Sequence, residues 1–110
     1  MPSWRYPDRP RAGSFEGSEH GSGVSFFVVD AAPGKGPGLH WHPYSETFVI
    51  QAGRGRFRRG EDAIEAEAGD VVVVPPETPH GFKSLGPDHL QLVAIHDSPT
   101  FVTTWLEEDE

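Results

Sequence analysis

Short runs of hydrophobic residues, separated by turns rich in glycine and proline, occupy most of the chain. Within several runs apolar and polar positions alternate, which is the spacing of a strand with one buried face. In the last run, Leu90, Leu92 and Ala94 occupy every second position. Because no long helical periodicity interrupts this pattern, we predict strands at 24–30, 39–42, 46–52, 54–59, 63–68, 71–74, 80–83 and 89–96.

Many short strands joined by regular turns are typical of an antiparallel sandwich or barrel. We therefore predict an all-β fold, with a jelly roll as the preferred topology. The continuous β-branched run Val71–Val74 is expected to be a buried strand. At 110 residues the chain can form one domain but not two independent cores, so we assign 24–110 to a single barrel domain.

The N-terminal part of the chain departs from this alternation. Residues 1–23 show no sustained periodicity, and we expect them to form an irregular arm. Its aromatic residues Trp4, Tyr6 and Phe15 are expected to lie against the domain or against a neighbouring subunit.

The segment that follows the last predicted strand carries a different signal. Phe101 and Trp105 are four residues apart, a spacing that places two side chains on one face of a helix. We therefore predict a short amphipathic C-terminal helix from Thr100 to Leu106, introduced by Ser98 and Pro99 and packed on the barrel exterior.

Composition and charge exclude several classes of function. The formal net charge is −8, and the only basic stretch, 54–59, is expected to be a solvated strand face, so nucleic acid is not an expected partner. No cysteine is present, which leaves nitrogen and oxygen as the strong metal donors. Without a signal-like segment or a long apolar run, we expect a cytoplasmic protein that does not enter a membrane.

Four residues with ligand-type side chains have spacings that suit a metal site. His40 and His42 are two apart, so in a strand both imidazoles face the same side. Glu46 is in phase with the apolar residues of the next strand, and His80 follows a stiff proline-rich segment. Three imidazoles and one carboxylate suit one divalent transition metal, Fe, Mn, Co, Ni, Cu or Zn, and a six-coordinate ion would keep two positions open.

These residues also carry a resemblance to a known family. Gly34, His40, His42, Glu46 and Gly53 match every fixed position of the first motif of the cupin superfamily. The resemblance covers about residues 24–96. It implies a double-stranded β-helix, often dimeric, in which His40, His42, Glu46 and His80 hold the metal.

A second stretch resembles the second cupin motif through Gly69, Pro75 and His80. The 15 residues between the two motifs form a short spacer that is typical of small bacterial cupins. Two positions depart from the family pattern, because Glu77 stands where the motif usually has glycine and Ser84 where it usually has asparagine. Neither position is a metal ligand, so the departures concern the loop geometry near His80.

The strand phases also indicate which side chains border a pocket. We expect the following to line it: Tyr44, Phe48, Ile50, Gln51, Phe57, Phe82, Leu92, Ala94 and His96. This mostly apolar set would suit a small organic acid or ketone. Candidate catalytic groups are Glu46, Glu77 and His96, although the preferred interpretation of Glu77 is a solvated loop carboxylate, and that of His96 is a residue that only hydrogen-bonds a turn.

Two functions remain open at this point. A metal with open positions would serve an enzyme that acts on a small molecule, either a dioxygenase or an isomerase or cyclase. Alternatively, the metal and pocket would hold a ligand without turnover, in a binding or sensing protein. A closed structural metal is a weaker third reading, because such sites favour tetrahedral and often thiolate ligation. A homodimer is expected, since the aromatic arm and the edges of a small barrel need cover.

Overall fold

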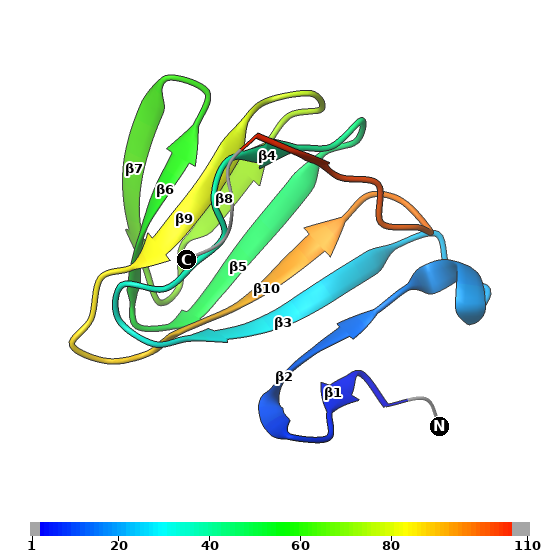
Figure 1. Ribbon diagram of the computed structural model, residues 1–110, viewed down its shortest axis with the longest axis horizontal. Helices are drawn as coiled ribbons and strands as arrows, with labels where there is room; N and C mark the ends of the chain where they lie inside the picture. Colours follow the sequence, from blue (N-terminus) through cyan, green and yellow to red (C-terminus); the bar gives the residue numbers. More distant parts are fainter. Residues whose placement is uncertain (1–2, 107–110) are drawn as a thin grey trace.

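The computed structural model describes residues 3–106, which form two antiparallel β-sheets packed face to face (Figure 1). One sheet has six strands in the order β1-β2-β3-β10-β5-β8, and the other has five in the order β11-β4-β9-β6-β7. The strands are β1 (Arg5–Tyr6), β2 (Arg9–Phe15), β3 (Ser25–Ala31), β4 (His40–Trp41), β5 (Glu46–Ala52), β6 (Arg54–Arg59), β7 (Asp62–Glu67), β8 (Val71–Val74), β9 (His80–Ser84), β10 (Leu90–His96) and β11 (Thr104–Trp105).

All eight strands predicted from the alternation are present, β3 to β10, so the all-β prediction is confirmed. The core lies between the sheets and is filled by the inward residues of each strand. In β10 these are Leu90, Leu92 and Ala94, all at most 3 % exposed. Their partners include Phe48, Ile50, Phe57, Val72, Val74 and Phe82.

The strand Val71–Val74 is not buried along its whole length, which corrects the prediction made for it. Val72 and Val74 are buried, whereas Val71 and Val73 are 57 % and 47 % exposed. The reason is that β8 is the edge strand of the six-stranded sheet, so its alternate side chains face outwards and its free edge has no neighbour to cover them.

The N-terminal arm is not irregular, because β1 and β2 form a hairpin that joins the six-stranded sheet. Only Gly13, Ser14 and Phe15 pair with β3, and towards Arg9 the strand diverges from its neighbour (Figure 1). Trp4 crosses so close to Gly13 that a Cβ there would overlap the Trp4 carbonyl oxygen. The hairpin therefore requires glycine at position 13, where any side chain would meet the Trp4 backbone. The spacing of apolar and polar residues in the sequence does not reveal this requirement.

The predicted C-terminal helix is also wrong. Thr104 and Trp105 form β11, which pairs with β4 in the five-stranded sheet. Residues four apart share a side in an extended segment as well as in a helix, so the aromatic spacing did not distinguish the two. Phe101 stacks on Phe27 at 4.4 Å between ring centroids, and Trp105 lies over His40 at 4.5 Å.

Helical structure within residues 3–106 is limited to one 3₁₀ turn, Gly17–Glu19. None of the described residues forms a helix with the length and hydrophobicity needed to cross a membrane.

Candidate metal centre

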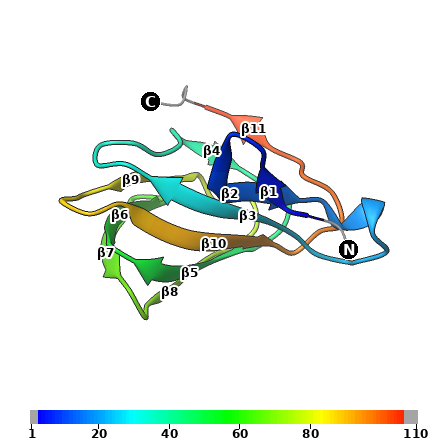
Figure 2. The ribbon, with the colours of Figure 1, turned by 90° about the horizontal axis from the view of Figure 1, so that it is seen from below.

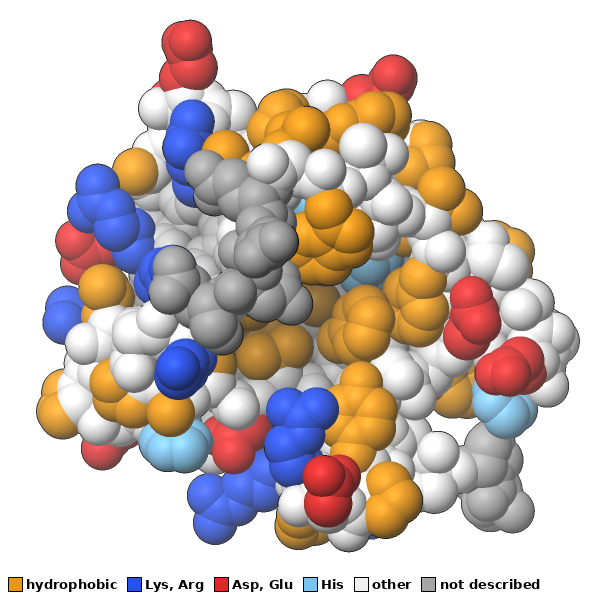
Figure 3. Space-filling model, in the orientation of Figure 1, with side chains coloured by type: hydrophobic (Ala, Val, Ile, Leu, Met, Phe, Trp, Pro, Cys, Tyr) orange, Lys and Arg blue, Asp and Glu red, His pale blue; other side chains and the backbone are white. Residues whose placement is uncertain are grey.

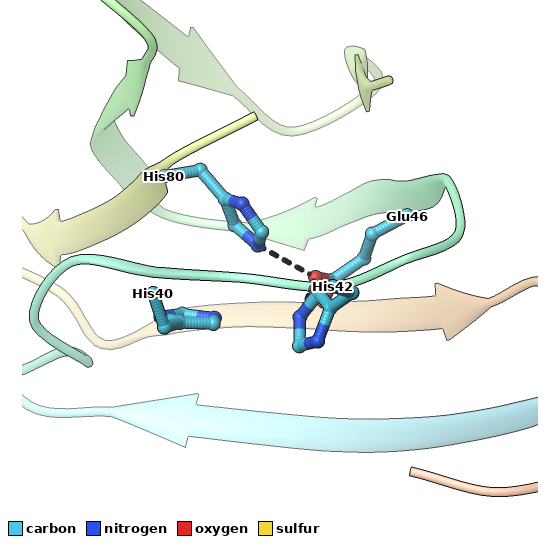
Figure 4. Close-up of side chains that lie close together, drawn as sticks. All are labelled: His40, His42, Glu46 and His80. Carbon is cyan, nitrogen blue, oxygen red and sulfur yellow. Dashed lines mark hydrogen bonds and ion pairs between the residues drawn. The ribbon is translucent and has the colours of Figure 1, made fainter. Parts of the chain in front are cut away.

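The structure brings His40, His42, Glu46 and His80 together at one end of the sandwich (Figure 4). One nitrogen or oxygen of each side chain lies within 4.8 Å of those of the others. All four residues are buried, with exposed fractions between 2 % and 7 %. Such a concentration of donor atoms away from water is what a metal site requires.

Strand pairing explains why these residues meet. His40 in β4 lies directly opposite His80 in β9, and Glu46 begins β5, where it lies opposite His96 in β10. The two pairs belong to different sheets, and the sandwich places the sheets face to face. Gly81 allows the loop before β4 to approach closely, because a Cβ at this position would lie 2.9 Å from the Pro37 carbonyl oxygen.

Each of the three imidazoles is oriented by a backbone carbonyl. Nδ1 of His40 donates to the Gly38 oxygen at 2.7 Å, and Nδ1 of His80 donates to the Thr78 oxygen at 2.8 Å. Nδ1 of His42 donates to the Val102 oxygen at 2.9 Å. A carbonyl can only accept, so these bonds place the hydrogen on Nδ1 and leave the Nε2 lone pair for another partner.

The Glu46 carboxylate lies among these Nε2 atoms. Its Oε1 is 2.9 Å from Nε2 of His42 and 2.8 Å from Nε2 of His80. Nε2 of His42 is buried and has no aligned hydrogen-bond partner among the described residues. Lone pairs that face a carboxylate oxygen repel it unless a proton or a cation lies between them. The donor set therefore fits a cation, and neutral histidine with carboxylate suits a divalent transition metal.

The protonation states favour metal binding at neutral pH. Burial lowers the pKa of His40 from 6.5 to about 4, so this imidazole is neutral. Burial would raise the pKa of Glu46, but the contacts with His42, His80 and His96 outweigh it and hold that pKa well below its usual value. Neutral imidazole and ionised carboxylate are the forms that bind metals.

A fifth histidine adjoins the group. Nε2 of His96 lies 3.1 Å from Oε2 of Glu46, and its Nδ1 lies 2.7 Å from the Tyr44 hydroxyl. Because a carboxylate can only accept, the hydrogen of a neutral His96 imidazole lies on Nε2, and Nδ1 then accepts from the Tyr44 hydroxyl, whose oxygen in turn accepts from the Val102 amide at 3.2 Å. Burial raises the pKa of Tyr44, which keeps the hydroxyl protonated. Tyr44 also stacks on the His42 ring at 5.0 Å.

A cavity of about 370 Å³ opens over His40, His42 and Glu46. Figure 3 shows a hollow surrounded by hydrophobic side chains, with histidine visible inside it. Of the pocket residues expected from the sequence, Phe48, Phe82, Ala94 and His96 border this cavity.

The other expected pocket residues do not border this cavity. Ile50, Phe57 and Leu92 are buried in the hydrophobic core, because the strands continue past the cavity into the closed part of the sandwich. Tyr44 lies behind His96 and His42 instead of on the cavity wall. Gln51 is exposed.

Glu77 does not border the cavity either, and its side chain is exposed. Its backbone has φ of 62°, the only positive value at a non-glycine position among the residues described. The Glu77 amide donates to the His42 carbonyl at 2.7 Å, and this bond connects the proline-rich segment to the residue that follows β4. The residue that replaces the expected glycine thus keeps a backbone conformation that glycine adopts more easily.

The sequence pattern did not reveal several residues around the cavity. Tyr6 and Arg9 reach it from the N-terminal hairpin, and Thr103 and Trp105 reach it from the C-terminal segment. These segments lack the alternation of a strand, so only their aromatic residues gave a signal that they pack on the domain.

Comparison with known proteins agrees with this fold. The family model described as Cupin domain matches residues 27–96. An uncharacterized protein of Methanocaldococcus jannaschii, MJ1618, is 32 % identical over 62 residues, which are 56 % of this chain and 50 % of that protein. The chain therefore spans about half the length of this curated relative.

Solved structures with the same fold include an uncharacterized conserved protein with a double-stranded β-helix domain from Klebsiella pneumoniae. It is 20 % identical, with a TM-score of 0.76, and the match covers 98 % of this chain and 97 % of that one. A variant of Bacillus subtilis oxalate decarboxylase is 21 % identical with a TM-score of 0.78, covering 86 % of this chain and 27 % of that one. A Lactobacillus farciminis oxalate decarboxylase formate complex is 22 % identical with a TM-score of 0.76, and the match covers 87 % of this chain and 31 % of that one. At these identities the likeness shows the fold.

Proposed function

Because the chain belongs to the cupin family, which matches residues 27–96, we propose that it is a metal-dependent enzyme acting on a small organic molecule. In this proposal His40, His42, Glu46 and His80 hold one divalent transition metal. The reaction is a dioxygenation, or an isomerisation or cyclisation. The oxalate decarboxylases share the fold at 21–22 % identity, so their reaction is not transferred to this chain.

One observation carries the proposal. The hydrogen bonds from Nδ1 to backbone carbonyls turn the Nε2 atoms of His42 and His80 towards the same carboxylate oxygen of Glu46, next to an open cavity. A structural site would have no need of a cavity of 370 Å³ beside its donor atoms. When bound, the metal supplies Lewis-acid or redox chemistry to a molecule in that cavity.

The residues of the chain would perform the remaining tasks. Phe48, Phe82 and Ala94 give the cavity an apolar wall that excludes water and orients an organic molecule. His96 is the candidate for moving a proton, because it borders the cavity and its Nδ1 receives a hydrogen bond from Tyr44. Glu46 is occupied as a ligand, and Glu77 lies outside the cavity.

Elemental analysis of the protein, expressed without added metal, tests the metal site. We expect about one transition-metal ion per chain in the wild type and a large loss in His80→Ala. The matched control is His20→Ala, which removes an exposed histidine that stacks on Phe15. Equal metal content in all three proteins, or no metal after reconstitution, would contradict the proposal.

A second candidate is a binding or sensing protein without turnover. It is favoured by the scarcity of acid and base groups on the cavity wall. Apart from the proposed ligands, the titratable side chains that border the cavity within residues 3–106 are Tyr6, Arg9, Asp30 and His96. Screening of small organic acids and ketones distinguishes the two, since an enzyme yields a product whereas a sensor yields saturable binding alone.

We also propose that two chains associate as a homodimer through the outer face of the six-stranded sheet. Strand registers align two nearly apolar rows across this face, and the free edge strand β8 continues both rows. The exposed ends of the rows are Val71 and Val73. A contiguous apolar surface of this kind marks an association site. The rows are Val28, Val93, Val49 and Val71, and Phe26, Ile95, Thr47 and Val73.

A further inference from the structure

We propose that Arg9, carried by the N-terminal hairpin, selects anionic ligands for the metal pocket, so that the preferred molecule carries a carboxylate away from its metal-binding end. This inference rests on the proposed function, because it concerns the same cavity and deepens the choice of ligand.

Arg9 borders the cavity because of the way the hairpin is built. β2 pairs with β3 only from Gly13 to Phe15, and the stretch from Arg9 to Ala12 diverges from the sheet (Figure 1). Seen from below, the hairpin lies on the side of β3 where β4 and β11 run (Figure 2). Arg9 and Ala12 thereby border the cavity together with Phe27 and Val29 of β3.

Arg9 is held in place by its cross-strand neighbour. Tyr6 and Arg9 are register partners in the hairpin, and the Arg9 guanidinium carbon lies 4.8 Å from the centre of the Tyr6 ring. Both residues border the cavity. Stacking on an aromatic face orients a guanidinium while its hydrogen-bond donors remain available.

The charges around the cavity leave Arg9 without an acidic partner. It is the only lysine or arginine among the described residues that border the cavity, and no carboxylate within residues 3–106 forms an ion pair with it. Asp30 is a carboxylate that borders the same cavity. Its Oδ1 lies 3.2 Å from Nδ1 of His89, so this carboxylate already has a partner.

Two positive centres would then flank a largely apolar space. The proposed metal with its three imidazoles and one carboxylate carries a net positive charge at one end, and Arg9 provides a bidentate donor at the rim. An organic molecule with a chelating head and a distal carboxylate satisfies both ends. An uncharged tail of the same length would leave the guanidinium in water and gain nothing from it.

The test uses two pairs of hydroxamates titrated into the cobalt-loaded full-length protein, with binding followed by the visible spectrum of the metal at constant ionic strength. Each pair differs only at the far end: succinate monohydroxamate against butyrohydroxamate, and glutarate monohydroxamate against valerohydroxamate. We expect the carboxylated member of at least one pair to bind wild-type protein about tenfold more tightly than its neutral counterpart.

Arg9→Gln should remove this preference and leave the binding of the neutral hydroxamates unchanged within about twofold, whereas Arg9→Lys should keep part of the preference. Arg5→Gln is the matched control: Arg5 stacks on Trp4 in the same hairpin at 4.9 Å but does not border the cavity, so its variant should behave as wild type.

The inference is overturned if neither pair shows a preference, or if Arg9→Gln retains it. If the neutral and the carboxylated member of each pair bind equally tightly, the inference is overturned, but the proposed metal site is still supported. Failure of the protein to take up cobalt or any hydroxamate would overturn the proposed function, and this inference with it.

Discussion

Nε2 of His96 lies 3.1 Å from Oε2 of Glu46, on the opposite side of the carboxylate from the oxygen that His42 and His80 approach. The two oxygens of Glu46 are thus occupied by different groups. With Tyr44 donating to Nδ1, the hydrogen of this imidazole lies on Nε2, the nitrogen that faces the carboxylate. His96 therefore orients Glu46 without being one of the four proposed ligands.

Replacement of His96 by alanine should weaken metal binding by about 10–100-fold, because a ligand carboxylate loses the group that orients it. The affinity can be measured by competition with a coloured chelator. Tyr44→Phe keeps the ring stacked on His42 but removes the hydroxyl, so its effect should be smaller than that of His96→Ala. Unchanged affinity in His96→Ala would show that Glu46 is positioned without it.

The stability of the metal-free protein should fall as the pH falls from about 6.5 to about 4. Burial lowers the pKa of His40 to about 4 in the folded state, so the unfolded chain binds the additional proton in this range and unfolding is favoured. The loss should be on the order of 1–3 kcal/mol. Urea unfolding of chelator-treated protein at several pH values measures it.

His40→Gln is the control for that experiment, because it removes the titrating imidazole. The protonation of Glu46, whose pKa is also lowered, acts in the same direction at lower pH and remains in the variant. A pH dependence as steep in His40→Gln as in wild type would contradict the assignment to His40.

Glu77→Gly should leave the free energy of unfolding unchanged or raise it by up to about 1 kcal/mol, since it relieves a positive φ of 62° at a non-glycine residue. Glu77→Ala removes the same carboxylate without that relief and should not stabilise. Both variants should retain metal content and any activity, because the side chain does not border the cavity. Loss of activity in both would identify Glu77 as a catalytic base.

Val49→Lys should convert the proposed homodimer to a monomer. The substitution places a charge in the middle of the apolar outer face, where burial against a second chain would require its desolvation. Light scattering coupled to gel filtration should show the mass falling about twofold. Leu85→Lys is the control, since Leu85 is exposed outside the sheet strands. A monomeric wild type would refute the dimer itself.

Alternation along the sequence was sufficient to locate the eight central strands, and the strand phases together with the cupin motifs pointed to the four residues of the candidate metal centre. The pattern carries this information because side chains two apart in a strand share a face, so His40 and His42 had to point the same way. Glu46 shared its phase with Phe48, which is buried. The order of the strands in the two sheets could not be obtained in this way.

The supporting contacts could not be predicted because they join distant segments without periodicity. The hydrogen bond from Nδ1 of His42 to the Val102 oxygen links residues 60 positions apart. The contact of Trp105 with His40 was hidden for a different reason: four-residue spacing is compatible with a helix and with an extended segment, and strand pairing decided between them.

The family match ends at residues 27 and 96, yet Tyr6, Arg9, Thr103 and Trp105 border the cavity from outside those limits. The barrel thus supplies the candidate donor atoms, while the two flanking segments add side chains to the cavity wall. The C-terminal flank also orients His42 through the Val102 carbonyl, so exchanging it would disturb the candidate metal centre. Exchanging the N-terminal hairpin between proteins with the same four residues would change the cavity wall and leave those contacts in place, which makes this hairpin the more direct target for engineering a new ligand preference.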